Sequence, residues 1–261
     1  MDEAACPGRH EGSVVLITGS THGIGRGMAR RFAREGAAVV VNDHGEYDGE
    51  AVAAELREAA DTDAVGYVEA DVGDPDALRG LVESTVEQFG GLDVLVNNVG
   101  LARTAHPRRL SVEDWERVMD TSLRSGWLAT KYAVEQLAGG GSVVNVSSAH
   151  GHATTKGYFP YNVAKAGVDG LTRALAVELG DIGVRVNAVS PGPIVIDEQQ
   201  PGPDRLDQGT EGDPLGRMGT VDDVAGLAAY LASDDAAYLT GTVVRADGGR
   251  GAVQYVPPGG R

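Results

Sequence analysis

Residues 14–25, VVLITGSTHGIG, decide the fold of this chain. They begin with a short run of apolar, mostly β-branched side chains and continue directly into a glycine-rich turn. After the turn, Ile24, Met28 and Phe32 keep the spacing of one helix face, and Gly36 ends the pattern. An apolar run of this kind is typical of a strand buried on both faces, so the stretch predicts a strand, a tight turn and a helix.

The same alternation fills the rest of the chain. Further strand-like runs lie at residues 38–42, 65–69, 92–97, 142–147, 184–190 and 242–246, and helix-period segments such as residues 75–89 separate them. Continuous apolar strands between helices predict a parallel sheet covered on both faces, because a half-exposed antiparallel sheet shows alternation instead. We therefore expect an α/β protein with one doubly wound domain at residues 12–250 and tails at 1–11 and 251–261. The Pro- and Gly-rich residues 191–214 are too long for an ordinary connection and predict a substrate lid.

The charge of the chain argues against several functions. Its 261 residues include 38 Asp and Glu against 22 Lys and Arg, a formal net charge of −16. Nucleic acid and anionic membranes repel such a protein, so neither is expected as a partner. The single cysteine, Cys6, excludes an intramolecular disulfide. The first residues carry no leader pattern, and no run approaches the roughly 18 apolar residues of a membrane span, so we expect a cytoplasmic protein.

The glycine turn predicts a site for the diphosphate of a dinucleotide. Free N–H groups at the start of a helix attract the anion, and glycines let the backbone approach it closely. A second strand ends at Asp43, 18 residues beyond Gly25. A carboxylate there can accept hydrogen bonds from both ribose hydroxyls of NAD and repels the extra phosphate of NADP. NADP stays the alternative, because a protonated His22 or His44 would offset part of that charge.

Two later strand ends supply further cofactor contacts. Asp71 and Val72 follow the third strand and are expected near the adenine. Residues 97–100, Asn-Asn-Val-Gly, end the fourth strand at the carboxyl edge of the sheet. Ligands bind at that edge in doubly wound sheets.

A candidate catalytic group follows the fifth strand. Tyr161 and Lys165 are four residues apart at the start of a helix, so both side chains project from one face. A nearby ammonium favours the phenolate form of a tyrosine, whose pKa is otherwise about 10. Ser148, at the end of the strand, can hydrogen-bond a substrate oxygen whose charge changes during reaction.

Together these motifs resemble the short-chain dehydrogenase/reductase family over residues 12–250. The matching segments, in order, are residues 18–25, residues 97–100, Ser148, residues 161–165 and residues 191–192. The resemblance implies a single-domain Rossmann fold, with a seven-stranded parallel sheet of order 3-2-1-4-5-6-7, and hydride exchange with NAD or NADP. It implies that Tyr161 is the acid/base, that Lys165 binds the nicotinamide ribose and tunes Tyr161, and that Ser148 orients the carbonyl. The cofactor-binding residues that it implies are Gly19, Thr21, His22, Gly23, Ile24, Gly25, Asp43, Asp71, Val72, Asn98, Val99, Gly100, Tyr161, Lys165, Pro191, Gly192 and Ile194.

Two positions depart from the family pattern. Ser122 stands where the family usually has an asparagine that completes a catalytic tetrad, so it is the fourth candidate catalytic residue. Ile196 stands where a threonine commonly contacts the nicotinamide carboxamide. An isoleucine side chain cannot make that hydrogen bond, so the backbone of Ile194 is expected to replace it.

The favoured function is an NAD(P)-dependent oxidoreductase for a small secondary alcohol or ketone, with NAD as the preferred cofactor. Three alternatives stay open: a non-redox dehydratase or epimerase with bound NAD, a thioester reductase or dehydrogenase, and a cofactor-binding scaffold without catalysis. Residues 41–45 loosely resemble NAD-linked hydroxyacyl-CoA dehydrogenases of the family, whereas residues 135–141 lack the cations expected for a substrate on an acidic carrier protein. His150 and His152 are candidate pocket residues, and a metal site is not expected there because no third ligand is evident.

Three arginines near the fourth strand form a second candidate surface. Arg103, Arg108 and Arg109 are expected to lie in a solvated loop, with an anionic substrate group as the alternative. The family resemblance also implies a homotetramer or homodimer that uses the helices starting near Ser111 and Tyr161.

Overall fold

The computed structural model describes residues 5–196 and 214–253. Its centre is a parallel sheet of seven strands in the order β3-β2-β1-β4-β5-β6-β9. The strands are β1 Val14–Ile17, β2 Ala38–Asp43, β3 Val65–Glu69, β4 Val94–Asn97, β5 Ser142–Val146, β6 Arg185–Pro191 and β9 Val243–Ala246. Each of the seven expected runs forms one of these strands, and the expected order is confirmed, with β9 in seventh place.

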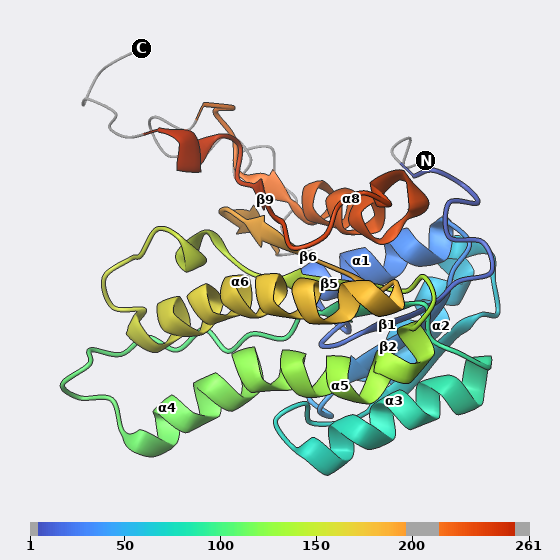
Figure 1. Cartoon of the computed structure of the whole chain (residues 1–261), viewed down its shortest axis with the longest axis horizontal. Coiled ribbons are helices and arrows are strands. Elements are labelled where there is room, and N and C mark those ends of the chain that lie inside the picture. The colour runs from blue at the N-terminus through green and yellow to red at the C-terminus, as the bar shows by residue number, and fades with distance from the viewer. Residues whose placement is uncertain (1–4, 197–213, 254–261) are drawn as a thin grey trace.

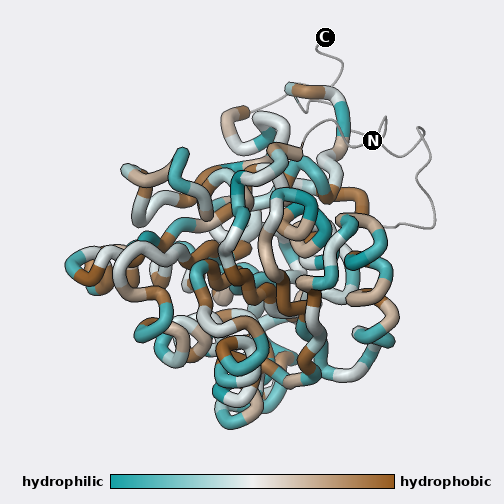
Figure 2. Tube along the Cα trace, turned by 90° about the vertical axis from the view of Figure 1, so that its right-hand side faces the viewer, coloured by the Kyte–Doolittle hydropathy of each residue, from teal (hydrophilic) through white to brown (hydrophobic). Residues whose placement is uncertain are grey.

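Helices cover both faces of the sheet (Figure 1). One face packs against α1 Gly23–Arg34, α2 Gly49–Ala60 and α8 Val221–Ala232. The other packs against α3 Pro75–Phe89, α5 Ser125–Leu137 and α6 Phe159–Leu179. α4 Val112–Met119 joins α5 through a π-helical turn at Asp120–Arg124. Figure 2 shows the hydrophobic segments gathered in the middle of the molecule.

Strand geometry explains why the central strands are mainly apolar. Successive side chains of a strand point to opposite faces of a sheet. Val15 and Ile17 of β1 accordingly belong to the core beneath α1 and α8, whereas Leu16 belongs to the core beneath α3 and α5. Because both faces are covered, most positions of the central strands are apolar. The buried polar exceptions Asn145 and Asn187 have hydrogen-bond partners in Thr172 and Leu239.

Two short strands, one before and one after residues 197–213, form a second, two-stranded sheet. β7 Ile194–Val195 pairs in parallel with β8 Gly219–Thr220. Most of the expected lid at residues 191–214 lies outside the described residues, as do residues 1–4 and 254–261 of the expected tails.

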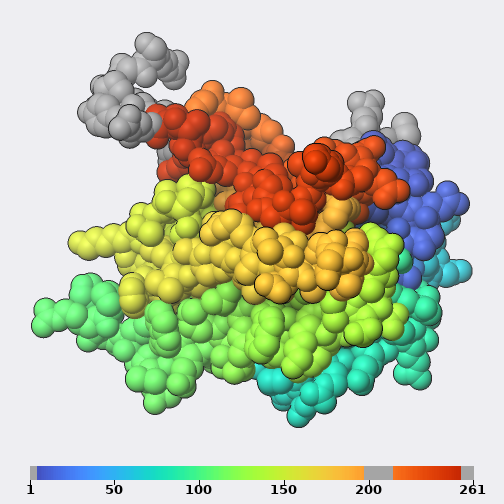
Figure 3. All heavy atoms as spheres, viewed as in Figure 1, coloured from blue at the N-terminus to red at the C-terminus, as the bar shows by residue number. Residues whose placement is uncertain are grey.

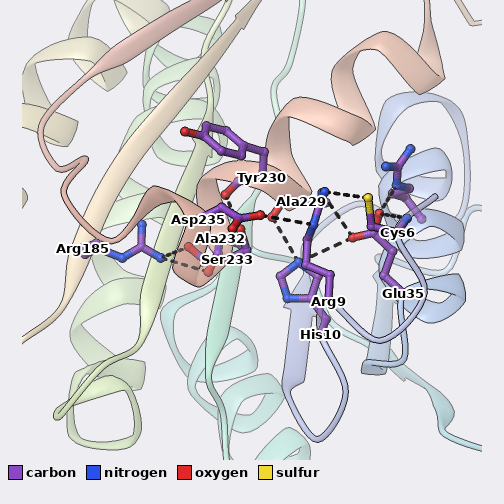
Figure 4. Close-up of polar contacts among 11 residues, drawn as sticks. Cys6, Arg9, His10, Glu35, Arg185, Ala229, Tyr230, Ala232, Ser233 and Asp235 are labelled. Atoms are coloured by element: carbon purple, nitrogen blue, oxygen red, sulfur yellow. Dashed lines mark hydrogen bonds and ion pairs between the residues drawn. The ribbon is translucent and has the colours of Figure 1, made fainter. Parts of the chain in front are cut away.

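Residues 5–11, expected to be part of a tail, belong to the packed domain (Figure 4). The backbone N–H of Cys6 donates to Glu35 at 3.0 Å, and the His10 ring contacts the carbonyl of Ala229 at 3.0 Å. Glu35 is fully buried, and Arg31 donates a hydrogen bond to it. The segment therefore joins the end of α1 to α8. We call this contact the N-terminal clamp.

Arg185 fixes the other side of α8. Its guanidinium donates to the carbonyls of Leu231, Ala232, Ser233 and Ala236, which satisfies carbonyl groups that the end of a helix leaves free. In the parts of the chain that the structure describes, no helix combines the length and hydropathy needed to cross a membrane.

Candidate active site

The glycine turn forms a backbone cradle at the carboxyl edge of the sheet. A Cβ on Gly25 would lie 2.2 Å from the carbonyl oxygen of Gly19, so only glycine permits this closeness. Gly19 has a φ of 60° and donates its N–H to Asn42 at 3.2 Å. Among the described residues, His22 makes no side-chain cap at the start of α1, and its first turn holds no acid. The uncapped N–H groups and the helix dipole fit the diphosphate of a dinucleotide.

Asp43 is held in place beside this cradle. Thr21 donates to its Oδ2 at 3.0 Å, and the backbone N–H of Glu46 donates to its Oδ1 at 2.8 Å. The carboxylate is buried, yet it reaches the cavity described below. His44 lies 3.8 Å from Asp43, whereas the His22 ring stacks on Tyr47 with centroids 4.6 Å apart.

A cavity of about 540 Å³ joins the cradle to the catalytic residues. All but one of the expected cofactor-binding residues line it, namely Gly19, His22, Gly23, Ile24, Gly25, Asp43, Asp71, Val72, Asn98, Val99, Gly100, Tyr161, Lys165, Pro191, Gly192 and Ile194. Within the described part of the chain, Thr21 does not line the cavity and acts through Asp43 instead.

Sequence reasoning missed several lining residues. Asn42 was part of the second strand, but its side chain bonds the cradle and the carbonyls of Val68 and Ala70. Arg117 and Thr121 also line the cavity from the edge of α4 and the turn after it. No sequence motif predicts that Arg117 and Thr121 line the cavity, because this depends on how α4 and the turn after it pack beside the sheet. The position of Asn42 after an apolar run could have identified it.

The three central catalytic candidates converge at one end of the cavity. Ser148 follows β5 and hydrogen-bonds Tyr161, which lies in the first turn of α6. Lys165, one turn later, is 2% exposed and donates to the carbonyl of Val146 at 2.6 Å. Its Nζ lies 5.7 Å from the centre of the Tyr161 ring.

The protonation of this group differs from the expectation. Burial raises the pKa of Tyr161, and the hydrogen bond from Ser148 only partly opposes it. The expected lowering of the Tyr161 pKa by Lys165 is not found, since burial of the phenol is the dominant cause and the ammonium of Lys165 bonds the carbonyl of Val146. Burial also lowers the pKa of Lys165 to about 8, and the charge of Asp169 opposes that change.

Ser122, the fourth candidate, takes a different place. It is buried in the π-helical turn, and its Oγ accepts a hydrogen bond from the backbone N–H of Leu101 at 2.9 Å. As far as the described residues define the cavity, Ser122 does not line it. The hydroxyl therefore holds the loop after β4 through Leu101.

The remaining predictions have mixed outcomes. Ile196 lines the cavity beside Gly23. His150 and His152 do not line the cavity that the described residues form, and most of the lid that would close the predicted pocket lies outside those residues. The His150 ring contacts the Tyr161 ring, with centroids 5.5 Å apart. Arg103 is paired with Asp114 at 2.7 Å. Residues 5–196 and 214–253 contain no group of three or more His, Cys, Asp or Glu side chains that could hold a metal.

Comparison with known proteins identifies the family. A family model described as Enoyl-(Acyl carrier protein) reductase matches residues 19–250. Over 244 residues the chain is 41% identical to the (2S)-((R)-hydroxy(phenyl)methyl)succinyl-CoA dehydrogenase subunit BbsD of Thauera aromatica, covering 91% of this chain and 96% of that one. It is 39% identical over 239 residues to the 3-oxoacyl-(acyl-carrier-protein) reductase FabG of Staphylococcus aureus, covering 90% and 96%.

A solved structure agrees with these relatives. A short-chain dehydrogenase/reductase variant from Serratia marcescens superimposes with a TM-score of 0.84 at 32% identity, covering 92% of this chain and 98% of that one. The chain belongs to the short-chain dehydrogenase/reductase family. It is an oxidoreductase of the kind that acts on CH–OH and C=O groups, and the family generally uses NAD or NADP.

Proposed function

We propose that this protein is an NAD-dependent oxidoreductase for small secondary alcohols or ketones. The observation that carries this proposal is the convergence of Ser148, Tyr161 and Lys165 at one end of a cavity whose other end is the glycine cradle. When bound, the nicotinamide dinucleotide supplies or accepts a hydride.

The protein residues bind the substrate and move a proton. Ser148 orients the substrate oxygen by a hydrogen bond, and Tyr161 donates its proton to that oxygen when a ketone is reduced. Burial keeps the pKa of Tyr161 above its usual value, so the phenol is protonated at neutral pH, as ketone reduction requires. Alcohol oxidation needs the phenolate and is therefore favoured at higher pH. Lys165 stays cationic at neutral pH and holds the ribose hydroxyls.

Replacing the acid/base tests this function. Tyr161→Phe should lower turnover by about 10²–10⁴-fold, while NADH affinity, measured by fluorescence, stays nearly unchanged because the ring remains. Turnover is followed at 340 nm over a panel of secondary alcohols and ketones. Substantial residual turnover in Tyr161→Phe would refute the role of Tyr161. Substrate conversion without any change at 340 nm would favour the non-redox alternative.

We infer NAD as the preferred cofactor from the fixed carboxylate of Asp43. Hydrogen bonds from Thr21, Glu46 and Tyr47 fix this carboxylate at the cavity, where a 2′-phosphate would meet a buried negative charge. The fluorescence of the reduced nicotinamide rises on binding, and NADH should reach half of this rise at a lower concentration than NADPH. Asp43→Asn should reduce this difference in affinity between the two nucleotides. Tighter binding of NADPH to the unaltered protein would contradict the inference.

A second candidate substrate class is a hydroxyacyl or oxoacyl thioester. BbsD and FabG are named for CoA-linked and carrier-linked substrates, and the exposed Arg117 at the cavity could meet a phosphate of such a carrier. Comparing kcat/KM for an acyl-CoA and for the matched free ketone separates the two classes.

A further inference from the structure

His150 makes a short polar contact between the turn that follows Ser148 and the helix that carries Tyr161. Its Nδ1 lies 2.6 Å from Oδ1 of Asn162, the residue after Tyr161. The backbone N–H of His150 donates to Oγ of Ser148 at 3.2 Å. One residue thus contacts the catalytic serine by its backbone and the neighbour of the catalytic tyrosine by its side chain.

Ring contacts hold the imidazole in one orientation. Its centroid lies 5.5 Å from that of Tyr161, at an interplanar angle of 66°. It lies 5.1 Å from the ring of Tyr158 on the other side of the turn. The backbone of the next residue, Gly151, is packed closely against α6, since a Cβ on Gly151 would lie 2.8 Å from Oδ2 of Asp169. The turn therefore has little room to move against α6.

Asn162 also contacts the segment that precedes α6. It is 8% exposed, and its Nδ2 donates to the carbonyl of Thr155 at 3.1 Å. Two residues further, the carbonyl of Gly157 accepts a hydrogen bond from Ala105 at 2.7 Å. Asn162 thus connects the His150 turn to the segment that pairs with the loop after β4.

The chemistry of the contact fixes the state of the histidine. The Asn162 oxygen can only accept, so Nδ1 of His150 carries the proton. An imidazolium also has a proton on Nδ1, so the contact persists in both charge states. The charged or titratable groups around the turn are Tyr161, Lys165 and Asp169 on α6, Tyr158 directly before that helix, and His152 at the end of the turn.

We propose that His150 and Asn162 are a positioning pair that sets the spacing between Ser148 and Tyr161. The role of the pair rests on the proposed function, since it acts on the acid/base residue. His150 does not exchange the reaction's proton. It holds the hydroxyl that orients the substrate and the phenol that protonates it in one arrangement.

Kinetics of single and double variants test the pair. His150→Ala and Asn162→Ala should each lower kcat about tenfold, the usual scale for one lost positioning hydrogen bond, with KM for the dinucleotide unchanged. The double variant should be slower than the unaltered protein by clearly less than the product of the two single losses, because both substitutions break the same His150–Asn162 hydrogen bond. His152→Ala is the matched control: it lies two residues away, is exposed, and should retain full activity.

A conservative substitution distinguishes a positioning role of His150 from a role in proton transfer. In His150→Asn the amide nitrogen takes the place of Nδ1 and restores the hydrogen bond, so kcat should recover and its pH profile should match that of the unaltered protein. Additive losses, failure of the asparagine to rescue, full activity in His150→Ala, or a changed pH profile in His150→Asn would each overturn the proposal.

Amide hydrogen exchange separates this proposal from the proposed function. Without any substrate, His150→Ala and Asn162→Ala should speed exchange in residues 149–158, and His152→Ala should not. Unchanged exchange in both variants would overturn the pair. A protein that oxidises or reduces none of the compounds tried but shows the faster exchange would contradict the proposed substrates alone.

Discussion

At the scale of single residues, the environment of Lys165 decides how the site responds to pH. Burial lowers the pKa of Lys165 to about 8, and Asp169 acts in the opposite direction. Asp169 is itself buried one turn along α6, where Ser147 donates a hydrogen bond to it. Ketone reduction, which needs both the protonated phenol and cationic Lys165, should therefore decline as pH rises through about 8.

Asp169→Asn should move that decline to lower pH, because it removes the charge that favours the ammonium. The asparagine keeps an oxygen for Ser147, so the fold should be preserved. The measurement is kcat/KM between pH 6 and 10, with Glu178→Gln on the exposed side of the same helix as the control. If kcat/KM declines at the same pH in Asp169→Asn as in the unaltered protein, Asp169 does not act on Lys165.

Residue types and spacing in the sequence predicted most of the site, but not all side-chain contacts. Tyr161 and Lys165 were predictable because a four-residue spacing on a helix places both on one face. The partner of Ser122 was not, since Leu101 comes from a loop whose path depends on the whole sheet edge. The raised pKa of Tyr161 also needed the structure, because burial is not visible in a motif.

At the scale of elements, α4, α5 and α6 leave an apolar groove on the surface. It is about 420 Å³ in volume, and Met119, Leu123, Trp127 and Leu171 are among its lining residues. Trp127 is 45% exposed. These helices occupy much of the lower half of the face in Figure 3, from green to yellow. We propose that a second copy of this chain covers the groove, as the family resemblance implies.

Trp127→Glu should convert the oligomer to a smaller species, because a carboxylate in an apolar interface loses its hydration. Light scattering after gel filtration measures the mass. Val177→Glu, an exposed apolar site on α6 outside the groove, should leave the mass unchanged. An unaltered protein that is monomeric at micromolar concentration would contradict the proposal.

The elements themselves were predictable where the apolar pattern is continuous. All seven strands of the main sheet lie in the predicted, mainly apolar runs, and α3 spans the residues 75–89 that its periodicity predicted. The two-residue strands β7 and β8 were missed, because two residues carry no period. The π-helical turn between α4 and α5 was also missed, since it depends on one extra residue in a helix that otherwise continues.

At the scale of the whole molecule, the N-terminal clamp joins distant parts of the chain. Its partners, Glu35 and Ala229, come from the end of α1 and from α8. Residues 5–11 show no apolar periodicity, so the sequence offered no sign that they pack. Their contacts are polar and buried, and their partners are far away in the chain.

The clamp should make stability depend on pH below neutrality. Burial lowers the pKa of His10 below the value of 6.5 that it has when unfolded. A lowered folded pKa means that the stabilisation is fully present above pH 6.5 and is lost as pH falls, because the unfolded chain binds the proton more readily. His10→Gln, which can still donate to Ala229, should show a smaller fall in Tm between pH 7 and 5. His152→Gln is the control at an exposed histidine. An equal fall in Tm for the unaltered protein, His10→Gln and His152→Gln would contradict the role of His10 in the pH dependence.

The β7 and β8 pairing has a consequence for how such an enzyme can change. Ile194 lies opposite Gly219 and Val195 opposite Thr220, so the chain leaves the sheet edge and returns to it within about 5 Å, the distance between paired strands. The chain between Val195 and Gly219 therefore starts and ends at two adjacent points. A connection of another length or composition could be joined at the same points without altering the seven-stranded frame.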